Sequence, residues 1–261
     1  FCIVDLHYTA NPDKRSPEWR DAIKASMPSR SFEMEYNKSW STHEGLPVFP
    51  DFNKTIHVKS GKIAPEPGIP LLLAFDFGLT PACLVGQLVG RQLRIIKEFQ
   101  ELNGSISKLA PLVTNYLNQN FLTWVHADNI TCYIDPAGFQ KAQTDERTCA
   151  DVMRKNGFTK IVPGPVAWEQ RKKAVEDYLV KIYSEGPTFL ISDECPILVD
   201  AMGGGYRYPD KATEIEPAQI RPVKDKFSHL ADCLQYLCAG ATALRKTYKI
   251  DLPTPSYGFT A

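Results

Sequence analysis

The 261-residue chain lacks the features that mark several common classes of protein. No apolar run approaches the roughly 20 residues that a membrane-spanning helix needs, and no signal-peptide pattern precedes a cleavage site. Lys plus Arg and Asp plus Glu balance at 30 each, so net charge alone does not indicate a nucleic-acid binder. The seven cysteines form no CxxC pair, which argues against structural zinc and for free thiols in a reducing compartment. We therefore expect a globular chain without a membrane partner.

Closely spaced prolines indicate a boundary near residue 68. Residues 1–68 are rich in Pro and turn formers, and KIAPEPGIP (62–70) prevents a continuous helix or central strand. Before it we expect a helix over 17–26, where Pro17 suits the first turn, and a short helix over 32–36. The chain starts at Phe1 in the strand-like segment FCIVDLHY, without Met, so we expect it to be a piece of a longer polypeptide.

The regular part of the sequence starts at Leu71. Residues 71–75 are apolar without alternation, as in a central strand covered on both faces. A hairpin around Gly90-Arg91 should follow, and the remaining pattern predicts strands over 131–134, 159–162 and 188–192. Helices are predicted over 105–118, 145–156 (with Thr144 as cap), 168–184 and 228–244. This order predicts an α/β fold, a ribonuclease H-like mixed sheet (antiparallel hairpin plus parallel strands) flanked by helices.

Three aspartates occupy positions where a metal site is expected. Asp76 ends the first strand, Asp135 follows the strand over 131–134, and Asp232 lies on the last helix. The first and fourth strands are neighbours in this topology, so two of the acids should lie side by side, and the helix can bring the third. Crowded carboxylates raise one another's pKa unless cations neutralise them. The arrangement predicts Mg²⁺ or Mn²⁺.

Two further residues near Asp232 are candidates for the same site. His229 lies three residues before Asp232, on one helical face, and could ligate metal, orient a water or move a proton. The alternative for His229 is a helix-start histidine bonded to a backbone carbonyl. Asp225 would extend this face if the helix started earlier, and it is otherwise a helix-terminal charge.

Basic residues provide candidate contacts for nucleic acid. Arg221, Lys224 and Lys226 precede the last helix and could line the path of a duplex, whereas Arg171-Lys172-Lys173 is expected to be a solvated helix face. Gly203 to Gly205 predict a mobile hinge, beyond which Arg207 could contact DNA or simply belong to a flexible loop.

Several motifs together resemble the nuclease domain of the large terminase subunit, the genome-packaging motor of tailed bacteriophages and related viruses. They are FDFGLTPA (75–82), YIDPAG (133–138) and KFSHLADCLQY (226–236), supported by EYNKSW and GLPVFPDF within 35–52. The resemblance implies that residues 1–68 are the tail of a preceding ATPase domain and a linker, and that 69–261 are the nuclease domain. It implies Asp76, Asp135 and Asp232 as catalytic metal ligands. For the fourth position of the site, the residues themselves favour His229 as a catalytic helper and, after it, Asp225 as a metal ligand.

The resemblance also implies an activity and its partners. We expect an endonuclease that cuts concatemeric double-stranded viral DNA with two divalent cations, Mg²⁺ or Mn²⁺, and with little sequence specificity. The full-length protein would work with its ATPase domain, the small terminase and the portal in the cytoplasm of the infected bacterial host. Neither GxxxxGKS nor GxxxxGKT occurs in the chain, so no ATP hydrolysis is expected from it.

Other functions remain compatible with the sequence. DFG followed by Thr80 also resembles the phosphate loop of sugar kinases and actin-like ATPases, a phosphotransferase class with a related core. A junction resolvase or transposase shares the same fold. A non-catalytic docking module, whose acids only stabilise the fold or contact a motor partner, is the alternative that is not an enzyme.

Overall fold

The computed structural model describes residues 7–26, 36, 46–121, 129–141, 147–209 and 220–247. The chain divides into two compact units, one made of Phe1–Pro50 and Met202–Val223 and the other of Asp51–Ala201 and Lys224–Ala261. Residues 51–68 therefore belong to the same unit as the sheet, and one short strand of that sheet lies within them. The ATPase origin expected for residues 1–68 stays a prediction.

The larger unit is built around a seven-stranded sheet in the order β1-β9-β4-β3-β2-β5-β6. The central strands β2, β3 and β4 pair antiparallel. On one side β5 and β6 continue in parallel from β2, and on the other β9 and β1 continue in parallel from β4. The predicted mixed sheet is confirmed. Its strands are β1 (Val58–Lys59), β2 (Leu71–Asp76), β3 (Ala82–Val89), β4 (Gln92–Gln100), β5 (Ile130–Ile134), β6 (Lys160–Pro163) and β9 (Phe189–Ser192).

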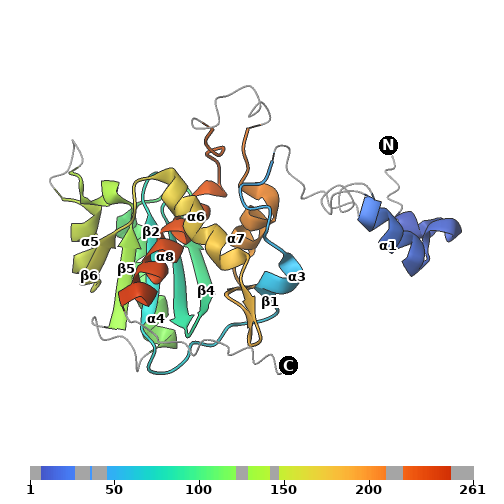
Figure 1. The fold of residues 1–261 in the computed structure, drawn as a ribbon. Helices are drawn as coiled ribbons and strands as arrows, with labels where there is room; N and C mark the ends of the chain where they lie inside the picture. Colours follow the sequence, from blue (N-terminus) through green and yellow to red (C-terminus); the bar gives the residue numbers. More distant parts are fainter. Residues whose placement is uncertain are drawn as a thin grey trace. The chain divides into compact units, whose positions relative to one another are not determined.

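Helices cover both faces of the sheet (Figure 1). The long helix α8 (Ser228–Thr247), red in Figure 1, packs on β2, β3 and β5, and α6 (Trp168–Leu179) packs on α8. The other face is covered by α4 (Ile106–Asn120) and α5 (Cys149–Lys155), whose buried residues share one core with Leu71, Leu73 and Phe75 of β2. Side chains alternate along a strand, so Asp76 points to the opposite face, the one that α8 covers.

The remaining elements of this unit are short. They are the helices α3 (Lys54–His57) and α7 (Pro196–Asp200), the turn η4 (Pro136–Phe139), and a separate hairpin of β7 (Ile182–Tyr183) and β8 (Gly186–Pro187). No helix within the described residues is long and apolar enough to cross a membrane.

The smaller unit contains the predicted helix α1 (Pro17–Ser26), after the turns η1 (Tyr8–Ala10) and η2 (Pro12–Lys14). In the same unit Val48 N donates to Tyr206 O at 3.0 Å. The expected hinge at Gly203 to Gly205 is instead part of a π-helical turn, η5 (Ala201–Gly205), in which Gly204 adopts a φ of 121°. A β-carbon is disfavoured at that φ, which explains a glycine there. The helix expected over 32–36 lies outside the described residues, apart from Tyr36.

Two helix boundaries differ from the prediction. Helix α5 begins at Cys149 rather than at residue 145, because the Thr148 and Asp151 side chains cap each other's backbone N–H groups. The predicted cap, Thr144, lies outside the described residues. Helix α6 ends at Leu179 rather than near residue 184. Ile182, which fits the helical spacing, is 58% exposed and belongs to β7, so the periodicity was misleading beyond Leu179.

Candidate metal centre

The carboxyl ends of β2 and β5 bring Asp76 and Asp135 together. The two strands are parallel neighbours, with Phe75 in register with Ile134, so the acid that follows each lies at the same edge of the sheet. Asp135 N donates to Phe75 O at 3.2 Å and continues this pairing. The apolar residues of both strands are buried, and this fixes where the chain emerges. The expected adjacency of the strands is thus confirmed.

Asp76 is a buried carboxylate with one close partner. It is 7% exposed, and its Oδ2 accepts a hydrogen bond from His229 Nδ1 at 2.9 Å. Burial raises the pKa of Asp76, the hydrogen bond from His229 opposes the rise, and the nearby Asp232 carboxylate adds to it. His229 therefore contacts an acid of the site rather than only the start of its own helix.

Asp232 lies in the first turns of α8, and protein groups engage both of its oxygens. Lys224 Nζ forms an ion pair with Oδ2, and Gln235 Nε2 donates to Oδ1 at 3.0 Å. The guanidinium of Arg171, on α6, lies 3.7 Å from Oδ1. Asp232 is only 3% exposed, so these contacts offset the cost of burying its charge.

Asp135 is partly exposed, and it caps the turn that follows it. Its Oδ1 accepts from Ala137 N at 3.0 Å, at the start of η4, where Pro136 occupies the first position. Gly138 closes this turn against Phe77, and a β-carbon on Gly138 would lie 2.2 Å from the ring. The DPAG sequence thus fits a tight loop that holds the carboxylate at the end of β5.

Tyr236 of α8 is buried beside Arg171 of α6. Burial raises its pKa, and the charges of Asp135, Asp232 and Asp76 each raise it further, whereas Arg171 opposes the rise. Gly164 packs against the Tyr236 ring, since a β-carbon there would lie 2.2 Å from it.

Arg171, like Gln235 and Tyr236, is a residue of this site that the sequence prediction missed. It was expected on a solvated helix face, but its side chain is only 15% exposed. Nη1 donates to the Tyr236 oxygen at 3.0 Å, and the guanidinium lies over the rings of Trp168 and Tyr236. A signal was present in the sequence: Arg171 comes three residues after Trp168 and four before the buried Val175, on the apolar side of α6.

The other candidate residues lie before α8. Asp225 Oδ1 accepts from Phe227 N at 2.9 Å and its carbonyl accepts from Ser228, so Asp225 holds the turn that leads into the helix. Lys226 Nζ lies over the Phe227 ring. In the smaller unit Arg207 Nη1 donates to Gly205 O and Arg221 Nη1 to Ile220 O. Their contact with DNA stays a prediction.

The donor set suits a hard divalent cation, because it combines carboxylates with one imidazole. Within the part of the chain that is described, no group of three or more His, Cys, Asp or Glu side chains lies close enough together to hold a metal ion. Each of the three aspartates instead has an oxygen in a contact with the protein, namely with His229, Ala137 or Lys224. Burial of Asp76 beside a second carboxylate is nevertheless the condition that a bound cation would relieve.

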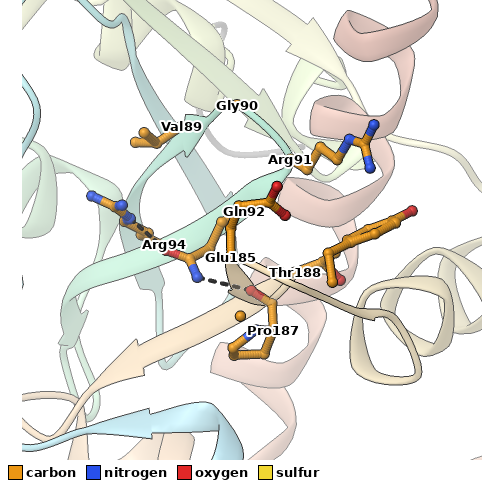
Figure 2. A pocket seen from close by; sticks show the side chains of 10 residues that line it. Val89, Gly90, Arg91, Gln92, Arg94, Glu185, Pro187 and Thr188 are labelled. Atoms are coloured by element: carbon orange, nitrogen blue, oxygen red, sulfur yellow. Dashed lines mark hydrogen bonds between the residues drawn. The ribbon is translucent and has the colours of Figure 1, made fainter. Parts of the chain in front are cut away.

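A separate cavity lies at the other end of the sheet (Figure 2). Its volume is about 400 Å³, and the β3–β4 turn and the β7–β8 hairpin line it. Arg91 lies over the Tyr183 ring at 4.5 Å, and Gln92 Nε2 donates to Pro187 O at 2.8 Å. Because Asp76 pairs with the first residue of β3 and the cavity lies beyond its last, the strand length separates them by roughly 23 Å. The cavity is not part of the acidic site.

No family model and no curated protein matches the sequence. Among solved structures, the chain is similar to the large terminase of a thermophilic bacteriophage, with a TM-score of 0.58 at 16% identity over 86% of this chain and 51% of that one. It is also similar to the P22 large terminase nuclease domain, with a TM-score of 0.52 at 11% identity over 73% and 89% of the two chains. The chain thus spans about half the length of the thermophilic phage protein. These likenesses show that the chain has the fold of large terminase nuclease domains, in agreement with the ribonuclease H-like mixed sheet predicted from the order of its strands and helices.

Proposed function

We propose that this chain is the nuclease part of a large terminase, a divalent-metal-dependent endonuclease that cuts concatemeric double-stranded viral DNA during genome packaging. The observation that supports this most strongly is the geometry at one edge of the sheet, where Asp76 and Asp135 lie at the ends of neighbouring parallel strands. Helix α8, which carries Asp232, reaches the same edge, because its His229 is hydrogen-bonded to Asp76. The acids come from two parallel strands and a helix of a fold that terminase nucleases share. The ATPase domain, the small terminase and the portal are proposed partners of the full-length protein, in the cytoplasm of the infected host.

In this proposal Asp76, Asp135 and Asp232 hold two Mg²⁺ or Mn²⁺ ions. When bound, such ions lower the pKa of a water and stabilise the leaving oxygen of a phosphodiester. The protein contributes the position and charge of the carboxylates. Asp76 lies between the other two elements, on the central strand β2, and is the best candidate to serve both ions.

His229 has a distinct part in the proposed reaction. Its Nδ1 is hydrogen-bonded to Asp76, which fixes the orientation of the ring. The side chain is 27% exposed, so in this proposal it can orient a water or exchange a proton with an oxygen of the substrate. Asp225 holds the turn before α8 and so positions His229 and Asp232. Its binding of an ion stays a prediction.

Cleavage of supercoiled plasmid tests the proposal. We expect nicking and linearisation with Mn²⁺ or Mg²⁺ and none with EDTA. Asp76→Asn, Asp135→Asn and Asp232→Asn should each lower the rate at least about a hundredfold, since even outer contacts of a metal site cost about 10- to 100-fold. The exposed Asp51→Asn is the control and should cut at the wild-type rate.

Two outcomes would contradict this assignment. Undiminished cleavage in all three variants would show that the nuclease activity does not come from these acids. ATP turnover by the chain would favour the actin-like or sugar-kinase reading instead. Plasmids of unrelated sequence should be cut at similar rates, because no base-reading module is evident in the chain.

A further inference from the structure

The Asp232 carboxylate is neutralised by two cations that belong to the protein. Lys224 Nζ pairs with Oδ2, and Arg171 Nη1 lies 3.7 Å from Oδ1. Gln235 Nε2 also donates to Oδ1 at 3.0 Å. The carboxylate is thus turned so that Oδ1 faces fixed donors of α6 and α8, while Oδ2 faces the lysine.

The two cations differ in how firmly they are held. Arg171 is 15% exposed, lies over two aromatic rings and donates to Tyr236, so its position is set by the packing of α6 on α8. The Lys224 side chain is 70% exposed and comes from a stretch without regular structure just before α8. The exposed ammonium is readily hydrated, so Lys224 can leave when another cation takes over the compensation of the buried Asp232 charge.

A lysine ammonium and a divalent cation cannot occupy the same carboxylate oxygen. Two positive charges a few ångströms apart repel each other, and Lys224 Nζ is within hydrogen-bond distance of Oδ2. Because Arg171 and Gln235 hold Oδ1, Oδ2 is the oxygen that Asp232 can offer to an ion. We propose that Lys224 competes with the divalent cation for Oδ2 of Asp232 and thereby weakens metal binding until the lysine is displaced. The inference rests on the proposed metal-dependent function and adds its regulation.

Displacement changes what Lys224 can do next. A released ammonium remains tethered beside the acids, where it can pair with a phosphate of the substrate. DNA that captures Lys224 would relieve the competition, so DNA and metal should favour each other's binding, as linkage requires. The same residue would then restrain the site without substrate and contact the substrate when it is present.

Calorimetric titration of Mn²⁺ into the DNA-free 261-residue chain tests this competition. Lys224→Met keeps the side-chain length but removes the charge, and it should tighten the Mn²⁺ Kd by about tenfold, the factor that about 1.4 kcal/mol of competition produces. Lys224→Arg keeps the charge and should stay within a few-fold of wild type. Lys226→Met, the matched control, removes an equal charge two residues away and should leave the Kd within about twofold.

The outcomes separate this inference from the proposed function. Mn²⁺ binding that is unchanged or weaker in Lys224→Met would overturn the competition. Equal tightening of Mn²⁺ binding in Lys226→Met would also overturn it, because the effect would then be one of general charge. If wild type and Lys224→Met both bind no Mn²⁺, the metal-dependent function itself fails. If Asp232→Asn abolishes Mn²⁺ binding while Lys224→Met tightens it, the competition by Lys224 and the metal-dependent function are both supported.

Discussion

Replacing Asp76 with Asn should make the protein more stable when divalent ions are chelated. Asp76 is 7% exposed, and both burial and the Asp232 charge raise its pKa, which means that the folded protein disfavours its charged form. Asn has nearly the same shape, and its carbonyl oxygen can still accept the hydrogen bond from His229. The substitution therefore removes the unfavourable charge and keeps the contact.

The size of the effect is that of relieving one buried charge. Single stabilising substitutions commonly contribute about 0.5–2 kcal/mol, and the hydrogen bond from His229 already offsets part of the cost, so we expect a gain on the order of 1 kcal/mol. For a domain of this size that corresponds to a Tm increase of roughly 2–4 °C. Differential scanning calorimetry in EDTA at pH 7.5 measures this increase. Asp51→Asn, at an exposed position, is the control, and its Tm should equal that of the wild type.

The pH dependence of the gain has a definite sign. The folded-state pKa of Asp76 lies above its ordinary value of 3.8, so between these two values the folded state binds more protons than the unfolded state. Wild-type stability falls as the pH rises through this window, whereas the Asn variant lacks this titration. The advantage of Asp76→Asn should be complete above the folded pKa and should disappear as the pH falls towards 3.8.

Divalent ions should reverse the order of stability. A ligand at about 100 times its Kd stabilises the folded state by about 2.7 kcal/mol, which exceeds the gain expected from the substitution. The Tm of the wild type should therefore exceed that of Asp76→Asn in saturating Mn²⁺. An Asn variant that melts below wild type in EDTA at neutral pH would refute the argument that the Asp76 charge is strained by burial.

Three further substitutions test the packing and capping around the sheet, each by urea unfolding. Gly240→Ala should destabilise by about 1–3 kcal/mol, because the new β-carbon would lie 2.3 Å from the Tyr133 ring where α8 crosses β5. Thr148→Ala should cost about 1 kcal/mol through loss of the α5 cap. Glu98→Ala should cost about 1–3 kcal/mol, since it leaves two backbone N–H groups at the start of α7 without their acceptor. An unchanged urea midpoint in any of them would contradict the contact assigned to that residue.

The sheet was predictable because the apolar composition of its strands indicates that they are buried. Residues 71–75 lack polar alternation, and the structure buries every residue of β2. The turn at Gly90 fixes the hairpin, and Gly90 adopts a φ of 58°. Once the order of strands is known, the adjacency of Asp76 and Asp135 follows from topology alone. Local pattern therefore determined the part of the candidate site that lies on the sheet.

The part of the site that lies on helices depends on tertiary packing. Arg171 reaches Asp232 only because α6 lies on α8, and no spacing within either helix encodes that contact. The charge run Arg171-Lys172-Lys173 favoured a solvated face, yet the first member shares the apolar side of α6 with Trp168 and Val175. Weighing the helical position of each residue separately, rather than the run as a whole, would have identified Arg171 as the exception.

The Lys224 contact shows why a residue's distance along the sequence is a poor guide here. Lys224 precedes Asp232 by eight residues, and a continuous helix would separate the two by about 12 Å along its axis. Helix α8 instead begins at Ser228, because Asp225 holds a turn through its contacts with Phe227 and Ser228. That turn lets the chain fold back, so that an exposed lysine reaches a buried carboxylate. Asp225 thus influences the acidic site through backbone geometry, because the turn that it holds lets Lys224 reach Asp232.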